Sequence, residues 1–390
     1  MSFNLIHQDK NSNARLGKLK AAHGVIDTPI FMPVGTQGTV KALTVRDLEE
    51  CSAQIILANA YHLYLRPGLE VIKNAGGLHK FMHWDKPILT DSGGYQVFSL
   101  AKLRKVADRG VEFQSHIDGS KHTLTPESVI ETQLTLGSDI LMPLDECVHY
   151  PCVRDEAEVA MRRTIQWAKR SKEALSQSRI PRQNEVGLAY PASRNLLFGI
   201  VQGATYPDLR KYCAEELAKI GFDGYSLGGI SVGEPQDLLY NIVQTTCEYL
   251  PKEFPRYLMG VGTPEDMISA VDCGVDMFDC VVPTRYGRNG TVFTWRGKIV
   301  VRNSPYINDL RPLDEECNCF VCRDYSRSYI RHLLNASEIL GAILVSYHNI
   351  YFYLSLMEKA RAAISEDRFS DFKKEFFAAY SIAKTKVEDY

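Results

Sequence analysis

The sequence predicts a (β/α)8 barrel that carries a small cysteine-rich subdomain near its C-terminus. Three observations predict this fold class: eight short, continuously apolar runs, helix-start signals behind several of them, and a C-x-C-x-x-C cluster late in the chain. Continuous apolarity is typical of strands that are covered on both faces, as in a parallel sheet. Eight strand-then-helix units favour a closed barrel over the runner-up, an open doubly wound sheet.

The predicted barrel strands are spread along most of the chain. Helix starts are indicated at Thr44, at Thr125 and at Thr263, because a threonine hydroxyl can cap the first free N–H groups of a helix. The eight runs are "PIFMPVG" from Pro29, "QIILANAYHL" from Gln54, "PILTDSGGYQ" from Pro87, "DILMPLDEC" from Asp139, "LLFGIVQG" from Leu196, "GYSLGGIS" from Gly224, "RYLMGVG" from Arg256 and "DMFDCVVPTR" from Asp276.

Two connecting segments depart from this alternation. Residues 115–124, "SHIDGSKHTL", predict a β-hairpin with an Asp-Gly turn, inserted after the third barrel strand. Residues 171–195 predict a polar crossover loop with no evident chemistry. Candidate functional residues are therefore sought at the strand ends and in the C-terminal part of the chain.

Composition excludes several classes of protein. The 390 residues are 45% hydrophobic and 24% charged, which is typical of a globular protein with a sizeable core. The net charge of -2 gives no overall attraction for nucleic acid, so a polyanion needs a local basic patch. The apolar stretch 341–357 contains Ser346, His348 and Asn349, which predicts a buried or interface helix and no membrane association. The first 25 residues lack the apolar run of a secretory signal, so we expect a reducing, cytoplasmic location.

The cysteine cluster predicts a metal site. Cys317, Cys319 and Cys322 are too close together for all three to form disulfides, and clustered thiolates in a reducing compartment usually hold zinc. No cysteine follows Cys322, so the fourth ligand is His332 or His348. Three cysteines and one histidine close a tetrahedral site without a position for water, which favours one structural zinc over a catalytic one. The seven other cysteines show no ligand spacing and are expected to be buried.

Polar residues gather where the predicted barrel strands end. They are Asp91, Asp145, Gln202, the pair Gly228-Gly229 and Asp279. Active sites of (β/α)8 barrels lie at the C-terminal ends of the strands. These residues therefore predict a site for one polar ligand.

Three carboxylates can carry chemistry there. Asp279 and Asp276 are three residues apart, so strand alternation sends them to opposite faces, and Asp279 is closer to the barrel mouth. A structural Asp279, bonded to backbone amides or to Arg285, is the alternative. Asp91, in "TDSGGYQVFS", is a candidate general acid or base, with a neighbouring tyrosine to stack on a substrate ring. Asp145 suits a heterocycle with N–H donors, or else caps the next helix.

A local basic patch follows the Asp279 strand. Residues 284–311 contain six basic residues against one acid, with four aromatic residues interleaved. Arginines beside aromatic rings suit phosphates and unstacked single-stranded bases. A solvated hairpin is the simpler interpretation. The six basic residues are Arg285, Arg288, Arg296, Lys298, Arg302 and Arg311, and the aromatic residues are Tyr286, Phe293, Trp295 and Tyr306.

Longer motifs carry a resemblance to a known family. In chain order they are "TDSGGYQVFS", "PLDEC", "GIVQGATYPDLR", "GYSLGGISVGE", "YLMGVGTPED", "MFDCVVPTRYGRNG" and "CNCFVCRDYSRSYIRHL". Together they resemble the tRNA-guanine transglycosylases, specifically the bacterial queuine-type enzymes, from about residue 4 to residue 376. The resemblance implies a (β/α)8 barrel with a zinc lobe. It also implies exchange of the wobble guanine of the tRNAs for Asp, Asn, His and Tyr for a 7-deazaguanine.

The resemblance also assigns roles to residues. It implies Asp279 as the nucleophile at the ribose and Asp91 as the general acid/base. The implied RNA contacts are Thr284, Arg285 and Arg288, and a homodimer interface is implied at Tyr325, Tyr329 and His332. It implies His348 as the fourth zinc ligand, beside Cys317, Cys319 and Cys322. The implied base-binding residues are Asp145, Gln202, Gly229, Tyr95, Leu227, Met259, Cys147 and Glu234.

Several finer predictions follow from the residues and from the resemblance. We expect a barrel over residues 1–302 completed by helices at 350–390, and a zinc subdomain over 303–349. Cys147 and Val232 favour the aminomethyl precursor as the incoming base, with queuine as the alternative. A catalytically silent tRNA-binding subunit is disfavoured because both carboxylates are present. The absence of further C-terminal domains disfavours the archaeal type, and only His62 lies near a strand end as a ligand for a metal-dependent hydrolase.

Overall fold

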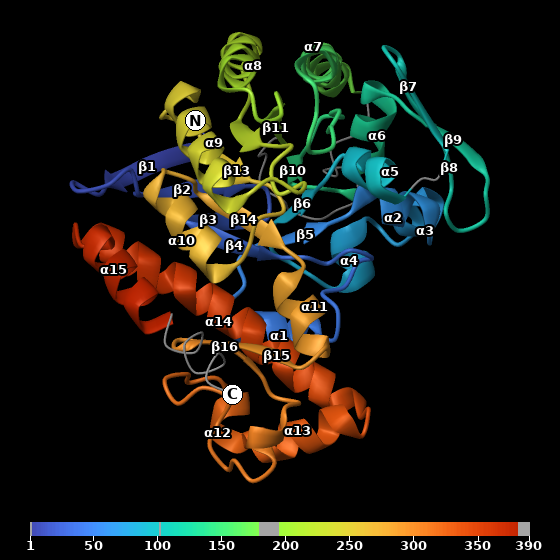
Figure 1. Ribbon diagram of the computed structural model, residues 1–390. Helices are drawn as coiled ribbons and strands as arrows, with labels where there is room; N and C mark the ends of the chain where they lie inside the picture. The colour runs from blue at the N-terminus through green and yellow to red at the C-terminus, as the bar shows by residue number, and fades with distance from the viewer. Residues whose placement is uncertain (1, 101–102, 179–194, 381–390) are drawn as a thin grey trace.

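The computed structural model describes residues 2–100, 103–178 and 195–380 of the chain. Its centre is an eight-stranded parallel sheet with the order β4-β14-β13-β12-β11-β10-β6-β5 (Figure 1). A parallel bridge between Val34 and Leu57 joins the two ends of this sheet, so the ring is closed. The predicted barrel is confirmed, and the open sheet was wrong. The strands are β4 (Ile30–Pro33), β5 (Ile56–Ala58), β6 (Ile88–Thr90), β10 (Ile140–Leu141), β11 (Leu196–Val201), β12 (Gly224–Leu227), β13 (Arg256–Leu258) and β14 (Met277–Cys280).

Helices follow the strands and surround the barrel (Figure 1). The predicted helix starts are confirmed: Thr44, Thr125 and Thr263 each accept a hydrogen bond from a backbone N–H in the first turn. These helices are α1 (Val45–Glu50), α2 (Ala60–Leu65), α3 (Leu69–Asn74), α4 (Leu78–Met82), α5 (Gly94–Leu100), α6 (Pro126–Leu136), α7 (Arg154–Gln177), α8 (Pro207–Ile220), α9 (Gln236–Tyr249), α10 (Pro264–Asp272) and α11 (Val282–Arg288).

An antiparallel sheet at the N-terminus packs against the barrel interior. It consists of β1 (Phe3–Gln8), β2 (Arg15–Ala21) and β3 (Gly24–Thr28). Phe3, Leu19 and Ile26 from this sheet belong to the same buried cluster as the barrel residues Phe198 and Met277. Apolar side chains therefore fill the barrel, and its chemistry is confined to the strand ends.

The insertion after the third barrel strand is a three-stranded antiparallel sheet. The predicted hairpin is confirmed by the pairing of β8 (Gly110–Gln114) with β9 (Lys121–Leu124), and β7 (Arg104–Ala107) adds a strand that was not predicted. The predicted crossover loop was partly wrong, because residues 171–177 are the last two turns of α7. Residues 179–194 of that segment lie outside the described residues.

Buried charges hold the strand starts together. Asp276, which is fully buried, accepts hydrogen bonds from Arg15 Nε at 2.9 Å and from the backbone N–H of Arg256 at 2.7 Å. Arg15 also donates to the carbonyl of Phe254 at 2.6 Å. Asp276 thus has a structural role at the N-terminal end of β14, whereas Asp279 lies in different surroundings near the other end.

A C-terminal lobe (residues 291–348) lies below the barrel in Figure 1. The long helix α14 connects it to the barrel, and the expected domain boundary at 349/350 falls inside this helix, so the domain division stays a prediction. Residues 381–390 of the expected closing helices lie outside the described residues. The remaining elements are β15 (Thr291–Thr294), β16 (Gly297–Val300), the short helix η2 (Ser304–Tyr306), α12 (Phe320–Asp324), α13 (Arg327–Asn335), α14 (Ile339–Ser365) and α15 (Phe369–Tyr380).

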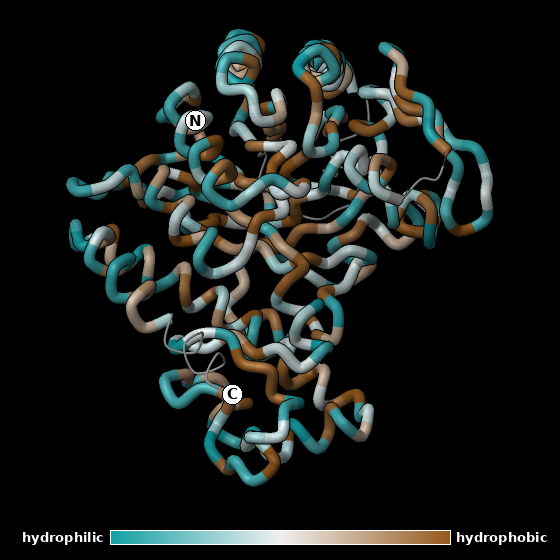
Figure 2. The backbone as a smooth tube through the Cα atoms, viewed as in Figure 1, coloured by the Kyte–Doolittle hydropathy of each residue, from teal (hydrophilic) through white to brown (hydrophobic). Residues whose placement is uncertain are grey.

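Helix α14 is long and apolar enough to cross a membrane by length and composition. Within the protein, however, 67% of its apolar window is buried. Ser346, His348 and Asn349 on this helix are all inaccessible to solvent. Figure 2 shows apolar segments running through the interior of the molecule and hydrophilic ones at its periphery. A buried core helix, as predicted from its polar residues, accounts for this pattern.

Candidate active site and metal centre

Asp279 lies on β14 and is held by two donors. The Tyr257 hydroxyl, from the neighbouring strand β13, donates to Asp279 Oδ1 at 2.6 Å, and the Gly260 N–H donates to the same oxygen at 2.8 Å. Burial raises the pKa of Asp279 above its ordinary value, against these two hydrogen bonds, which lower it. Arg285 is not among its hydrogen-bond partners. The second carboxylate oxygen receives no recorded hydrogen bond from the described part of the chain.

Asp91 follows β6 and is 9% exposed. Asn59 Nδ2 donates to Asp91 Oδ2 at 2.5 Å, and the Ala60 N–H, at the start of α2, donates to Oδ1 at 2.8 Å. Burial raises the pKa of Asp91 to about 6, and the charge of Asp279 raises it further, while the hydrogen bonds lower it. The charge of Asp279 thus acts on Asp91, and both carboxyl groups retain a proton to higher pH than an ordinary aspartate.

Asp145 and Gln202 form a second polar pair. Gln202 Nε2 donates to Asp145 Oδ2 at 2.8 Å, and the Ser92 hydroxyl donates to Oδ1 at 3.3 Å. Burial raises the pKa of Asp145 to about 6, against hydrogen bonds from these two residues. The helix-cap alternative was wrong, because α7 starts only at Arg154. Gln202 Oε1 is buried and has no hydrogen-bond partner, which leaves an acceptor for an incoming donor.

The glycine pair after β12 lies directly against Gln202. A Cβ at Gly228 would stand 2.9 Å from Gln202 Nε2, and a Cβ at Gly229 would collide with Gln202 Oε1. Gly229 also has a φ of +62°, which a residue with a side chain rarely adopts. The glycines thus let backbone groups reach the side of the amide where the free acceptor lies.

The other predicted base-binding residues differ in exposure and in their hydrogen bonds. Tyr95 is 52% exposed on α5, and Met259 is half-buried directly after β13, so a ring sandwiched between them stays a prediction. The Leu227 carbonyl accepts a hydrogen bond from the Met259 N–H at 3.3 Å. The Glu234 carboxylate accepts hydrogen bonds from the backbone N–H groups of residues 231 and 232. Cys147 is buried, which raises its thiol pKa to about 12.

Sequence reasoning missed three residues of the site. Asn59 and Ser92 lie within predicted strand segments, but the sequence pattern assigned them no role. Tyr257 lies in another predicted strand, whose apolar pattern indicates a core residue. Each acts across strands: Asn59 holds Asp91, and Tyr257 holds Asp279. The order of neighbouring strands is the signal that would have found them.

The basic patch contributes less than its sequence indicates. Phe293 and Trp295 were wrongly expected to stack on bases, because they are buried under α14 with 2% and 9% exposure. Arg296 pairs with Glu316, and Arg311 pairs with an aspartate two residues before it. The solvated-hairpin interpretation was also wrong for β15, which is mostly buried, and only β16 exposes residues, among them Lys298.

The start of the patch, on α11, differs from the rest. Arg285 is exposed and has no recorded carboxylate partner in the described ranges, and Arg288 donates to the Thr284 carbonyl at 3.0 Å. Burial and the charge of Arg285 together lower the pKa of Arg288. Helix α11 follows β14, so these two like charges stand next to the Asp279 strand.

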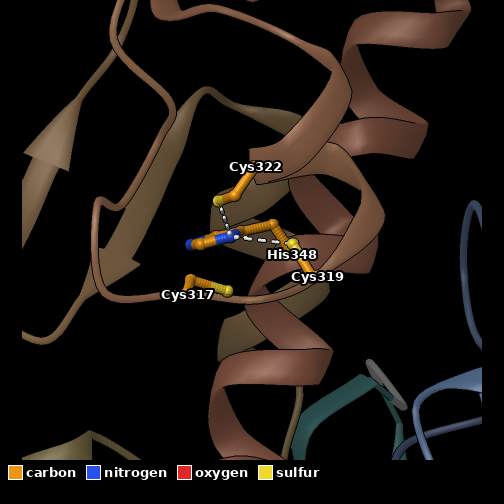
Figure 3. A group of neighbouring side chains, drawn as sticks. All are labelled: Cys317, Cys319, Cys322 and His348. Atoms are coloured by element: carbon orange, nitrogen blue, oxygen red, sulfur yellow. Dashed lines mark hydrogen bonds between the residues drawn. The ribbon is translucent and has the colours of Figure 1, made fainter.

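The cysteine cluster is closed by a histidine from α14. Cys317, Cys319, Cys322 and His348 are all buried and point toward one another (Figure 3). His348 Nδ1 lies 3.3 Å from Cys322 Sγ and 3.5 Å from Cys319 Sγ. The other ring nitrogen donates to the Phe293 carbonyl at 2.8 Å, which leaves Nδ1 as the free ligand atom.

The chemistry of this donor set fits zinc. Hydrogen bonds from the neighbouring thiols lower the pKa of Cys319 to about 4, while the same contacts raise that of Cys322. A divalent cation replaces the protons on such clustered thiols. The sequence left His332 and His348 open, and His332 is not part of the cluster. Four protein ligands leave no position for a reacting water.

A second group of possible metal ligands consists of His23, His79 and Asp139, which are connected by hydrogen bonds. His23 Nδ1 lies 2.8 Å from Asp139 Oδ1, and His79 Nε2 lies 3.2 Å from Asp139 Oδ2. The two rings are stacked with centroids 3.6 Å apart and an interplanar angle of 19°. Backbone N–H groups also donate to both Asp139 oxygens, from His23 to Oδ1 and from Ile88 to Oδ2, each at 2.9 Å, so hydrogen bonds satisfy this buried carboxylate. His62 belongs to neither group.

The residues expected at a dimer interface cluster on the C-terminal lobe. Tyr325 and Tyr329 stack with centroids 5.6 Å apart at 14°, and Tyr329 is 41% exposed. Leu310 and Ile339 of the same lobe are 81% and 75% exposed. Exposed apolar side chains gathered in this way are typical of interaction surfaces.

Comparison with known proteins decides the family. A family model described as queuine tRNA-ribosyltransferase matches residues 9–382. The chain belongs to this family. Proteins of that name from Caldanaerobacter subterraneus subsp. tengcongensis and Thermoanaerobacter pseudethanolicus are 58% and 57% identical to it, over 97% of this chain and 98% of each relative. The relative from Acetivibrio thermocellus is 51% identical over 98% of both chains. The resemblance inferred from the motifs and the prediction of a pentosyltransferase enzyme are thereby confirmed.

Proposed function

We propose that this member of the queuine tRNA-ribosyltransferase family exchanges the wobble guanine of the tRNAs for Asp, Asn, His and Tyr. The incoming base is 7-aminomethyl-7-deazaguanine, and the product leads to queuosine. The observation that carries this proposal is the pair of carboxyl groups with raised pKa values, Asp91 and Asp279, at the strand ends of a barrel of this family.

Two displacements at the ribose account for the exchange. In the first, an Asp279 oxygen bonds to C1′ while the bond from C1′ to N9 of guanine breaks, and Asp91 gives its proton to the leaving base. In the second, the incoming base gives a proton to Asp91, its nitrogen bonds to C1′, and the ester bond to Asp279 breaks. The configuration at C1′ is retained. A pKa of about 6 lets Asp91 hold a proton for the first step and release it again.

The polar pair beside the glycines would bind the edge of the base. The Asp145 carboxylate suits the N–H donors of guanine, and the free Gln202 acceptor and the Gly229 N–H lie beside it. Tyr95 and Met259 would stack on the two faces of the ring. Glu234 already holds the peptide groups that follow the glycine pair, close to Leu227, where we place the aminomethyl substituent.

The remaining parts would hold the tRNA. Arg285 and Arg288 would contact phosphates of the anticodon loop, together with Thr284. Arginines without a carboxylate partner attract the negatively charged RNA backbone. A structural zinc at the cysteine cluster would brace the lobe, and a second copy of the chain would pack on Tyr325, Tyr329 and His332. The ten free cysteines agree with a cytoplasmic location.

The test is base exchange in purified components. Unmodified tRNA-Tyr is incubated with radiolabelled guanine, and label retained in the RNA is counted. We expect wild-type protein to incorporate label, Asp279→Asn to incorporate none, and Asp237→Asn, a change on the exposed face of α9, to behave as wild type. Competition by unlabelled 7-aminomethyl-7-deazaguanine and by queuine then identifies the preferred base.

Two outcomes would contradict the proposal. Binding of tRNA without incorporation by wild type would favour a silent RNA-binding subunit. Incorporation of label that persists in Asp279→Asn would show that the exchange does not pass through a covalent intermediate on Asp279. Stronger competition by queuine would replace the aminomethyl base with queuine and leave the exchange reaction intact.

A further inference from the structure

Arg210 is a fully buried arginine directly beneath the proposed base site. It lies in the first turn of α8, and its side chain is 0% exposed. The Nε group donates to the Ala204 carbonyl at 2.7 Å, in the loop after β11. The Nη2 group donates to the carbonyls of Gly228 and Gly229 at 3.0 and 3.3 Å, in the loop after β12. One side chain thus connects the two loops that carry Gln202 and the glycine pair.

No counter-charge explains this burial. Arg210 has no carboxylate within ion-pair distance among the described residues, and Nη1 is buried without a hydrogen-bond partner. Burial lowers its pKa to about 10, so the guanidinium remains charged at neutral pH. The groups that oppose this lowering of the pKa are the Cys213 thiol, Glu234 and the Cys147 thiol, and burial raises the pKa of both thiols to about 12, so neither is a counter-charge at neutral pH. Burial of an unpaired charge is costly, which points to a role beyond packing.

The position of the charge identifies that role. The Gly228 carbonyl and the Gly229 N–H belong to one peptide group. The Gly228 N–H, which belongs to the preceding peptide group, donates to the Val201 carbonyl at 3.0 Å and anchors the chain just before this peptide. No acceptor for the Gly229 N–H is recorded within the described ranges. A hydrogen bond from a charged donor to a carbonyl polarises its peptide and strengthens the N–H at the far end as a donor.

We propose that Arg210 is a positioning residue that polarises the Gly228–Gly229 peptide so that the Gly229 N–H binds the carbonyl oxygen of the substrate base. This inference rests on the proposed function, which supplies guanine as the ligand. The inference adds a determinant of base specificity. A strengthened Gly229 N–H donor raises the affinity for a base with an oxo group at the edge that faces Gly229, relative to a base with a weaker acceptor at the same position. Arg210 itself does not touch the base.

The test compares two bases that differ at that one acceptor. Dissociation constants for guanine and for 6-thioguanine are measured by calorimetry, because sulfur accepts hydrogen bonds more weakly than oxygen. In Arg210→Gln, which keeps a donor but removes the charge, we expect guanine affinity to fall about tenfold, since a charged hydrogen bond contributes about twice as much as a neutral one. The 6-thioguanine affinity should fall by much less, so the preference for guanine narrows.

Two further variants separate this role from simple support of the fold. Arg210→Lys keeps the charge and should retain the guanine preference within about threefold, even if its fork-shaped contacts are lost. Leu217→Ala on the same helix removes a fully buried side chain and should lower the melting temperature without changing the preference. Equal weakening of both bases in Arg210→Gln, or a preference lost in Leu217→Ala as well, would overturn the inference.

Failure of the proposed function gives a different result. If wild type binds neither base and exchanges no label, the transglycosylase assignment is wrong and Arg210 retains only a structural role. If wild type exchanges guanine while Arg210→Gln shows an unchanged preference and an unchanged KM for guanine, the assignment stands and the inference about Arg210 is wrong.

Discussion

Asp91 and Asp279 differ from ordinary surface aspartates because almost all of their surroundings are protein. Burial is the first cause of the raised pKa at both positions, and hydrogen bonds oppose it. A carboxyl group in such surroundings costs folding free energy whenever it is ionised. The raised pKa values should therefore be detectable in the pH dependence of the free energy of unfolding, without an assay of base exchange.

The first prediction concerns this signature at Asp91. The folded-state pKa of about 6 exceeds the ordinary 3.8, so between these values the unfolded chain releases a proton that the folded protein keeps. Wild type should therefore lose stability relative to Asp91→Asn as the pH rises from 4 to 8, by about 3 kcal/mol at most. Urea unfolding of both proteins at pH 4 and pH 8 measures the difference.

A surface aspartate supplies the control for that measurement. Hydrogen bonds from Ser120 lower the pKa of Asp118 to about 2, below the ordinary 3.8, so its carboxylate is ionised in both the folded and the unfolded chain over most of this pH range. The stability difference between wild type and Asp118→Asn should therefore stay nearly constant over the rise in pH, whereas the difference for Asp91→Asn changes. A constant difference between wild type and Asp91→Asn at both pH values would show that this carboxyl is not perturbed.

At single residues, sequence reasoning reached the groups that have distinctive chemistry. The strand-end position of Asp91, Asp145 and Asp279 follows from local pattern alone, because polar residues directly after apolar runs stand out. Tyr257 and Arg210 were not found, since their roles depend on which strand or loop lies next to them in space. The local sequence pattern does not show which strands and loops are adjacent in space.

Helix α14 is the element on which the C-terminal lobe depends. It supplies His348 to the cysteine cluster, and its Asn349 accepts a hydrogen bond from the Phe293 N–H at 3.0 Å and donates to the Pro283 carbonyl at 2.9 Å. The cysteine cluster, β15 and the first turn of α11 are thereby connected through two successive residues of one helix. Metal binding and the position of α11 are linked through this contact.

The second prediction concerns removal of the metal. A structural zinc contributes about 10 kcal/mol or more in zinc-finger peptides, which exceeds the stability expected of a small lobe. Chelation should therefore raise amide hydrogen exchange in α12, α13 and β15–β16, while β11 and β12 remain protected. Hydrogen exchange with mass spectrometry measures both regions, and metal analysis should find one zinc per chain.

Paired cysteine variants make this prediction specific. Cys322→Ser should bind no zinc and should reproduce the exchange pattern of the chelated protein. Cys152→Ser, at a cysteine outside the cluster, should retain zinc and normal protection. Unchanged exchange in Cys322→Ser would mean that packing against α14, not metal, holds the lobe.

Elements were predicted well where they are self-contained. The barrel strands and three helix caps follow from apolar runs and single threonines, and the structure has them at those places. Strand β7 and the end of α7 were missed, because β7 is short and begins with two charged residues and the last turns of α7 expose polar side chains on a surface. Their secondary structure depends on pairing and packing more than on local apolarity.

At the scale of the whole molecule, the exposed apolar side chains of the C-terminal lobe predict a homodimer. In the third prediction, Tyr329→Glu places a charge in this surface and should halve the mass observed by sedimentation equilibrium at micromolar concentration. Tyr212→Glu is the matched control, because Tyr212 is also 41% exposed but lies on α8. A monomeric wild type, or a dimer that survives Tyr329→Glu, would place the interface elsewhere.

The closure of the barrel has a consequence for biosynthesis. Strand β4 pairs with β14, so the first barrel strand must wait for a partner that ends at Cys280. The N-terminal segment is further bound to the start of α15, where the Asp9 carboxylate accepts a hydrogen bond from the Phe369 N–H at 3.1 Å. Contacts this distant in sequence fold slowly, because loop closure must precede them. While the ribosome is still translating the chain, the barrel remains an open sheet with two exposed edges, and chaperones that shield such edges have most of the elongation time in which to act.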